Sequence, residues 1–536
     1  MIRSLGAGLF ALGIALSACA QQDKAAMKYA KFITPEDARK HLSILASDEF
    51  EGRETGKPGA MKAADYIAAE FKRLGLKPPV NGSYFQDIPM VEAIANIQKF
   101  TVDNQPFTFG EEFYLSGNPS PAKLNFSEVL FVGYGISDAQ WDELKDLDLK
   151  GKAIVVINDG EPMKDGKSLV TGTSEASAWS ITRNKRVAAL ADKGPALILA
   201  YSPRTAQVLK SYKEYFTQPQ TMLKSALDKG AGKPQTLNID AKLADALVKA
   251  SGKTITQLKS AIDSAGKPLS VSLKSQIVYE SAPKITPVKA VNVLGYMEGK
   301  DKTLKNELLL LTAHYDHVGV LPETAENKNS DRINNGADDD GSGTTGVLEM
   351  ATAFSKAKAA GKGPRRSILF MTVVGEEKGL LGSEYYSENP VFPLENTITD
   401  LNTDMIGRID PDHEADSNYV YLIGSNKLST DLHKISEQAN STYTKLNLDY
   451  KYNDPADPNR FYYRSDHYNF AKHNIPIIFY FNGVHADYHK PSDEVSKITF
   501  PMLAKRAQLI FYTAWDLANR EKRPVVDVKN DMPEDR

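Results

Sequence analysis

Residues 307–316 read ELLLLTAHYD, a largely apolar run that ends in polar side chains. Such a run, with no polar alternation, predicts a strand that is buried on both faces. Further strands of the same texture are predicted along the chain, at residues 367–374, 398–405, 419–423 and 475–481. Helices are predicted between them, at residues 344–360 and 428–439. This alternation predicts an α/β fold, with a mostly parallel, twisted sheet and helices on both of its faces.

Polar motifs gather where the predicted strands end, and one more stands in front of a helix. The motifs are AHYD at residues 313–316, GADDDGSG at 336–343, GEE at 375–377, NTDM at 402–405 and DYH at 487–489. Because the carboxyl ends of parallel strands meet at one edge of a sheet, we expect these five motifs to converge. The sequence therefore predicts one functional site at that edge.

The motifs offer His, Asp and Glu as metal ligands, since the chain has a single cysteine. Such ligands without a thiolate are typical of zinc in hydrolytic sites. One catalytic zinc needs only three protein ligands, so five candidates indicate two ions that share a bridging carboxylate. The Asp-rich run lacks the twelve-residue ligand spacing of an EF-hand calcium loop. Residue type alone leaves three choices open, between His314 and His317, among Asp338, Asp339 and Asp340, and between His485 and His489.

Together and in this order, the motifs resemble the di-zinc aminopeptidase family of the bacterial leucyl aminopeptidase type, which is related to glutamate carboxypeptidase and the transferrin receptor. The resemblance implies a phosphorylase/hydrolase-like zinc exopeptidase fold and two Zn²⁺ ions. It implies that His314 and Asp404 bind one zinc, that Glu377 and His489 bind the other, and that Asp339 bridges them.

The resemblance also implies roles for residues beside the ligands. Glu376 matches the general base of the family, which fits its place next to Glu377: consecutive side chains diverge, so one can bind metal while the other carries a proton. Tyr488 matches the tyrosine that stabilises the oxyanion. The remaining expectations are that Asp316 orients His314, that Asp493 orients His489, and that Arg464 faces the substrate.

Between the first helices and the motif-bearing region, the texture changes to short apolar runs. This stretch contains no histidine, because none occurs between His41 and His314, so a separate metal site is not expected there. The turn GYGI at residues 133–136, followed by Trp141 and a strand around Val155, resembles the protease-associated (PA) domain of many exopeptidases. We therefore predict a peptidase domain split into residues 33–112 and 286–522, with a β-rich α+β insert at 113–285.

The first residues predict export. Arg3 is followed by an apolar stretch that is shorter than the 18 or more residues of a spanning helix, and then by Leu-Ser-Ala-Cys at residues 16–19. This ending resembles a bacterial lipobox, which implies cleavage before Cys19, lipidation of that thiol and an exported lipoprotein of the cell envelope. A polar tether at residues 20–32 and a polar tail at 523–536 complete the predicted organisation.

These observations predict a zinc-dependent aminopeptidase that acts on peptides. A formal net charge of −3, with 41% hydrophobic and 25% charged residues, is ordinary for a globular protein and shows no bias toward nucleic acid. Three alternatives remain open: a carboxypeptidase or dipeptidase of the same family, a glutaminyl cyclase, and a non-catalytic binding protein. Glutaminyl cyclases resemble the catalytic domain without an insert, so the predicted insert at residues 113–285 disfavours that alternative.

Overall fold

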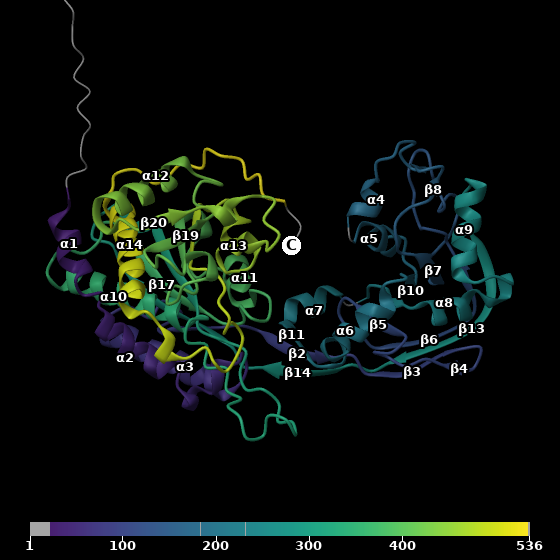
Figure 1. The fold of residues 1–536 in the computed structure, drawn as a ribbon, viewed down its shortest axis with the longest axis horizontal. Helices are drawn as coiled ribbons and strands as arrows, with labels where there is room; N and C mark the ends of the chain where they lie inside the picture. The colour runs from purple at the N-terminus through teal and green to yellow at the C-terminus, as the bar shows by residue number, and fades with distance from the viewer. Residues whose placement is uncertain (1–21, 183, 231, 534–536) are drawn as a thin grey trace, which may run out of the picture. The chain divides into compact units, whose positions relative to one another are not determined.

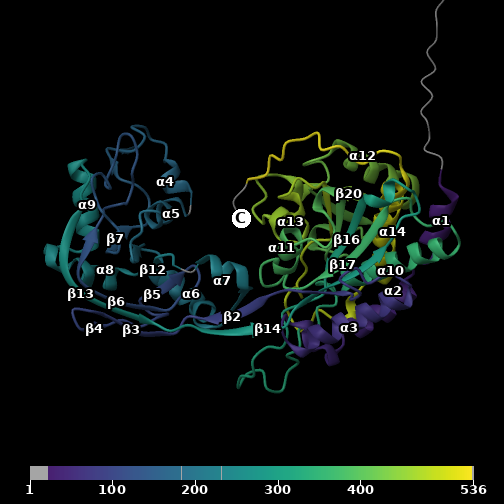
Figure 2. The same cartoon turned by 180° about the vertical axis from the view of Figure 1, so that it is seen from behind.

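The computed structural model describes residues 22–182, 184–230 and 232–533. The chain forms two compact units, which are drawn in Figures 1 and 2. The split unit contains the residues up to Ile88 and those from Ala290 onward, and the inserted unit runs from Pro89 to Lys289. The predicted signal peptide and Cys19 lie outside the described residues. Among those described, no helix combines the length and apolarity needed to cross a bilayer.

The split unit is built on one mixed eight-stranded sheet. Its strands, in spatial order, are β1 (Phe85–Asp87), β15 (Val291–Met297), β17 (Ser367–Val373), β16 (Leu308–His314), β18 (Thr397–Thr403), β21 (Ile477–Phe481), β19 (Tyr419–Ile423) and β20 (Asn447–Asp449). The four central strands, β17, β16, β18 and β21, run parallel, whereas β15 and β19 pair with them antiparallel. The predicted α/β class is confirmed.

Helices cover both faces of this sheet. On one face lie α10 (Gly341–Ala359) and α14 (Phe500–Asn519), and on the other lie α11 (Leu381–Glu388) and α13 (His467–Ala471), as Figures 1 and 2 both show. Every residue of β16 is buried, which explains why its sequence is apolar on both faces. Further helices that pack on this unit are α2 (Pro35–Leu45), α3 (Pro58–Arg73) and α12 (Thr430–Ala439).

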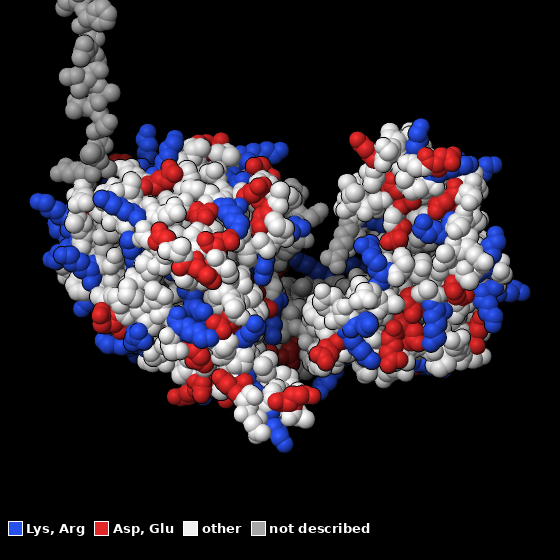
Figure 3. All heavy atoms as spheres, in the orientation of Figure 1, with Lys and Arg blue, Asp and Glu red and all other residues white. Residues whose placement is uncertain are grey.

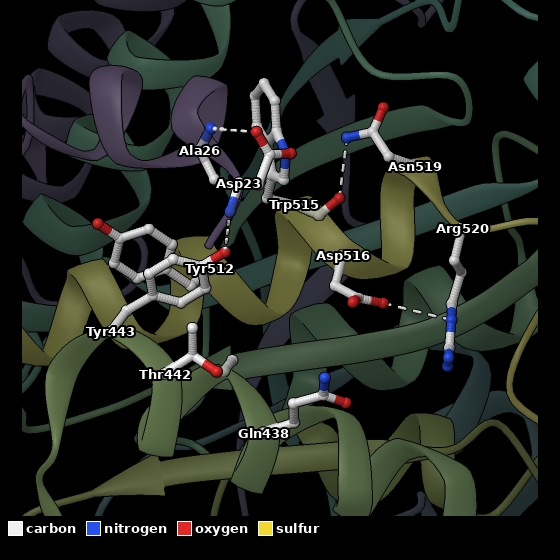
Figure 4. A pocket seen from close by; sticks show the side chains of 11 residues that line it. Asp23, Ala26, Gln438, Thr442, Tyr443, Tyr512, Trp515, Asp516, Asn519 and Arg520 are labelled. Atoms are coloured by element: carbon white, nitrogen blue, oxygen red, sulfur yellow. Dashed lines mark hydrogen bonds and ion pairs between the residues drawn. The ribbon is translucent and has the colours of Figure 1, made fainter. Parts of the chain in front are cut away.

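The predicted tether is instead largely a docked helix, α1 (Lys24–Ala30). Asp23 caps it, and the indole nitrogen of Trp515 donates to the Asp23 carboxylate over 2.9 Å, as Figure 4 shows. The Tyr29 ring stacks on Trp515 with centroids 5.9 Å apart. The tether prediction was wrong because the buried face of this helix is only about one turn long, which is too short to give a recognisable helical pattern in the sequence. That face consists of Ala26, Tyr29 and Ala30.

The predicted polar tail also contacts the split unit. Residues 523–533 form no helix or strand, but Met532 is buried against the core of the split unit. The side chain of Asn530 donates to the Tyr462 hydroxyl over 2.8 Å. The described part of the tail is therefore tied to the surface rather than free of it.

The inserted unit is α+β, as predicted. Its main sheet has the order β4 (Gln105–Pro106), β3 (Ile97–Val102), β13 (Val271–Ser281), β6 (Ala122–Phe131), β7 (Ala153–Ile157), β10 (Leu197–Tyr201), β12 (Gln235–Ile239) and β5 (Phe113–Ser116). Two smaller sheets are formed by β11 (Gln220–Leu223), β2 (Met90–Ile94) and β14 (Lys284–Val288), and by β8 (Met163–Lys164) and β9 (Lys167–Ser168). Its helices are α4 (Ala178–Ile181), α5 (Lys185–Ala191), α6 (Thr205–Thr217), α7 (Lys224–Gly230), α8 (Ala241–Val248) and α9 (Ile255–Ala265).

The predicted boundaries of the insert, residues 113 and 285, are corrected to Pro89 and Lys289. Strand β2 pairs with β14, and β3 pairs with β13, so these early strands belong to the inserted unit. A local change of texture did not reveal them, because their partners lie at the far end of the insert.

On the face drawn in Figure 3, acidic and basic side chains are interspersed. In the view of Figure 3, neither sign gathers into one continuous face. This distribution agrees with the small net charge of the sequence.

Candidate metal centre

The predicted ligands gather at the carboxyl edge of the parallel strands. His314 is the last residue of β16, and Asp404 directly follows β18. Glu377 lies in the loop after β17, and His489 in the loop after β21. Asp339 precedes Asp340, the N-cap of α10. Parallel pairing brings these loops to one side of the sheet, as expected for this class of fold.

Asp339 stands between two histidines. Its Oδ1 atom lies 3.3 Å from His314 Nε2, and its Oδ2 atom lies 3.0 Å from His489 Nε2. Asp404 Oδ2 is 3.6 Å from the same His314 nitrogen, and Glu377 Oε1 is 3.1 Å from the same His489 nitrogen. The structure thus brings all five predicted ligands together, in two groups that share one carboxylate.

The residues present fit a pair of divalent cations. The ligand atoms of His317, Asp339, Glu377 and His489 lie within 4.8 Å of one another, and so do those of His314, Asp340 and Asp404. All donors are imidazoles and carboxylates, which suits zinc. The carboxylates are buried side by side, Asp339 being 3% and Asp404 6% exposed. A bound cation stabilises the ionised form of such neighbouring buried carboxylates.

Other contacts narrow two of the three choices that residue type left open, the one among Asp338, Asp339 and Asp340 and the one between His485 and His489. Asp340 Oδ1 accepts from the backbone N–H groups of Gly343 and Met405, at 2.8 and 2.9 Å, so this carboxylate caps α10. Asp338 accepts from the N–H of Gly407 and lies 3.3 Å from His485 Nε2. Asp338 and His485 therefore pair with each other. Asp339 and His489 remain as the aspartate and the histidine that can bind metal.

The neighbouring glutamates differ in their electrostatic surroundings. Among the protein groups alone, burial raises the pKa of Glu376 well above its ordinary value, and the nearby carboxylates raise it further. Burial acts in the same direction on Glu377, but hydrogen bonds with His317 and His489 bring the pKa of Glu377 below its ordinary value. Pairs of carboxyl groups whose pKa values are pushed apart commonly divide acid–base roles between them.

A cavity with an apolar wall adjoins these groups. Glu376 lines it, with its carboxylate 4.0 Å from His314 Nε2. Arg464 stands at the same cavity and donates to the Tyr488 hydroxyl over 3.3 Å. Burial raises the pKa of Tyr488, so its phenol keeps its proton and can donate it in a hydrogen bond. The apolar wall consists of Met405, Phe461, Phe479, Phe481 and Val484.

Of the two predicted orienting aspartates, Asp316 contacts His314 as expected, though through its backbone, whereas Asp493 has other partners. The backbone carbonyl of Asp316, rather than its carboxylate, lies 3.0 Å from His314 Nδ1, and the carboxylate accepts from Thr55. Asp493 accepts from the backbone N–H groups of Asp338 and Asp339, at 2.9 and 3.2 Å. Its contacts therefore hold the loop of the shared carboxylate, and the expectation that it orients His489 is corrected.

Sequence reasoning missed two supporting residues. Ser465 donates to Asp404 Oδ2 over 2.7 Å. The buried guanidinium of Arg53 donates to backbone carbonyls that flank the ligands, namely those of Tyr315, Asn335 and Gly336, each within 2.9 Å. The glycines on either side of residues 53–55 were the available signal for Arg53, because such a loop allows close backbone approach.

An α/β sheet with paired imidazole–carboxylate groups at its carboxyl edge is the arrangement expected of a metal-dependent hydrolase. Residues 292–514, which lie in the split unit, match the model of Peptidase family M28. This match confirms the predicted family resemblance over that region of the chain.

Individual relatives agree with this assignment. A probable leucine aminopeptidase of Arthroderma otae is 31% identical over 207 residues, which are 38% of this chain and 53% of that protein. Aminopeptidase YwaD of Bacillus subtilis is 26% identical over 241 residues, which are 44% of this chain and 46% of that protein. The chain thus spans about half the length of the curated relatives it matches.

A solved structure shares the fold. The aminopeptidase from Aneurinibacillus sp. strain AM-1 superposes with a TM-score of 0.50 at 17% identity, covering 95% of this chain and all of that one. At this identity, the similarity concerns the fold alone.

Proposed function

We propose that this protein is a zinc-dependent aminopeptidase that removes N-terminal residues from peptides. The observation that carries the proposal is the position of the Asp339 carboxylate between His314 and His489, each of which has a second carboxylate beside it. Family membership and the leucine aminopeptidase among the relatives support the same activity. His314 and Asp404 would hold one zinc, and Glu377 and His489 the other.

When bound, the two zinc ions would supply Lewis-acid chemistry that activates a water molecule and polarises the scissile carbonyl. Glu376 lines the cavity and belongs to neither ligand group, so its carboxylate takes the proton from the attacking water and returns it to the leaving amine. The Tyr488 phenol donates a hydrogen bond to the oxygen on which negative charge develops.

Restriction to chain ends follows from the charges around the cavity. The carboxylates that line the cavity, Asp339, Glu376 and Asp404, attract the ammonium group of a peptide N-terminus, while the apolar wall accepts the adjoining side chain. Arg464 favours a second candidate, because its exposed guanidinium at the cavity can bind a free substrate carboxylate. That candidate is a carboxypeptidase or dipeptidase of the same family.

One matched pair of peptides tests the proposal. A peptide with a free N-terminus should release its first residue, and the same peptide with an acetylated N-terminus should remain intact. Cleavage of the acetylated peptide, or release of the C-terminal residue, would contradict aminopeptidase activity. A glutamine-led peptide should yield free glutamine, whereas pyroglutamate would indicate a cyclase.

A variant separates catalysis from metal binding. Glu376→Gln should lower kcat by about 10²- to 10⁴-fold, because the amide cannot accept the proton. Its zinc content should equal that of the unaltered protein, as Glu376 is not in either ligand group. Full activity of this variant would show that another group is the base.

We also propose that the protein is a lipoprotein held in the cell envelope through Cys19, and that the inserted unit is a PA-like domain. The lipobox-like residues 16–19 and the turn at residues 133–136 support these two proposals. Incorporation of labelled palmitate into the protein, and its loss in Cys19→Ala, tests the first. A soluble, unlabelled protein with an intact Cys19 would contradict it.

A further inference from the structure

His317 is completely buried beside the second ligand group and has no role in the chemistry above. Its Nδ1 atom lies 2.9 Å from Glu377 Oε1 and 3.7 Å from Asp339 Oδ2. Its ring meets the ring of His489 edge to face, with centroids 5.4 Å apart. His317 thus reaches the same two carboxylate oxygens that His489 contacts.

A histidine at this position has two possible roles, as a metal ligand or as a hydrogen-bond donor. A ligating imidazole normally donates its other N–H to an acceptor. Nε2 of His317 is buried and has no hydrogen-bond partner within the described residues. Ligation through Nδ1 would bury that N–H unpaired, at a cost of about 1–3 kcal/mol. With the proton on Nδ1 instead, only a lone pair lacks a partner, and Glu377 accepts the bond.

The surroundings of His317 hold it in this orientation. Its backbone N–H donates to the Arg53 carbonyl over 3.2 Å, and the N–H of Gly319 donates to the Gly52 carbonyl over 3.1 Å. On the other side, a Cβ atom on Gly336 would lie 2.5 Å from the His317 ring. The loop at residues 52–55 and the loop that carries Asp339 therefore enclose His317 from both sides.

We propose that His317 is a positioning residue that holds the Glu377 carboxylate and thereby sets the affinity of the second zinc site. The inference rests on the proposed pair of zinc ions. The first group depends on different contacts, from His314 Nδ1 to the Asp316 carbonyl and from Ser465 to Asp404. Removing the His317 donor therefore weakens one ion and leaves the other, which yields a protein with a single tightly bound zinc.

The test compares zinc binding in three variants of the full chain. His317→Phe keeps a ring but removes the donor, and His317→Gln offers an amide N–H in its place. His473→Phe is the matched control, since His473 pairs with Glu388 outside the ligand groups. Zinc is titrated against a chromophoric chelator, and thermal unfolding of the metal-free proteins shows whether each variant folds.

In His317→Phe, one of the two zinc ions should bind about 10- to 100-fold more weakly, as is typical when the partner of a metal ligand is lost. His317→Gln should recover much of this affinity, and His473→Phe should match the unaltered protein. Unchanged binding of both ions in a folded His317→Phe protein would overturn the proposal.

X-ray absorption of the zinc-loaded protein separates a positioning residue from a ligand. Two imidazoles for two zinc ions, contributed by His314 and His489, support the proposal. A third imidazole would make His317 a ligand and overturn it. These measurements need no peptide cleavage, so a protein that binds zinc but cleaves nothing would contradict the proposed function and leave this inference standing.

Discussion

Glu349→Gln should stabilise the split unit at neutral pH. Glu349 lies in the middle of α10, and its side chain is 1% exposed. Its carboxyl group accepts from the backbone N–H of Thr34 over 3.0 Å, and the His41 imidazole lies 3.9 Å away. Burial lowers the pKa of His41, so this histidine supplies little positive charge at neutral pH. Burial raises the pKa of Glu349 to about 8 from an ordinary value of 4.5.

The direction of the effect follows from that shift. The folded protein keeps the Glu349 proton up to about pH 8, whereas the unfolded chain releases it above about pH 4.5. The free energy of unfolding is therefore highest below pH 4.5 and falls as the pH rises toward 8. At pH 7 the difference between the two pKa values corresponds to about 3 kcal/mol of lost stability. Glutamine cannot ionise, and its carbonyl can still accept from Thr34. The variant should therefore gain about 3 kcal/mol at pH 7 and almost nothing at pH 4.

Denaturant unfolding followed by tryptophan fluorescence measures this gain. Trp515 reports on the split unit once Trp141 and Trp179 of the inserted unit are replaced by Phe in both proteins. The free energies of unfolding of the variant and its parent should diverge between pH 4 and pH 8. Two curves that stay parallel over this range would refute the idea that Glu349 is held protonated in the fold.

Three further outcomes are expected. Tyr488→Phe should lower kcat by about 10²- to 10³-fold with little change in KM, since it removes a hydrogen-bond donor to the developing oxyanion. A comparable rise in KM would instead indicate that Tyr488 binds the substrate. Dialysis against a chelator should abolish peptide cleavage, and added zinc should restore it, whereas chelator-resistant activity would exclude a metal-dependent mechanism. Burial lowers the pKa of His467 to about 3. The free energy of unfolding of the split unit should therefore fall by about 3 kcal/mol between pH 7 and pH 4, because only the unfolded chain binds the proton in this range. His467→Gln, which can still donate to the Tyr462 carbonyl, should reduce that fall in a denaturant titration at the two pH values.

The sequence by itself determined the class of fold and the location of the site. Burial on both faces makes β16 apolar throughout, and the polar motifs directly follow the strands that carry them, so both signals lie within a few neighbouring residues. The choice of Asp339 over its neighbours came from the family resemblance. The contacts agree, because Asp340 caps α10 and Asp338 pairs with His485.

Only the tertiary structure decided which distant segments meet. The insert begins at Pro89 because β2 pairs with β14. Helix α1 is docked because the Tyr29 ring stacks on Trp515. The contacts of Asp493 with the Asp339 loop and of His317 with Glu377 likewise join different loops. Local periodicity reports how one segment folds and which face it buries. Hydrogen bonds between distant segments depend on the tertiary packing of the whole chain, and no local pattern in a single sequence reports that packing.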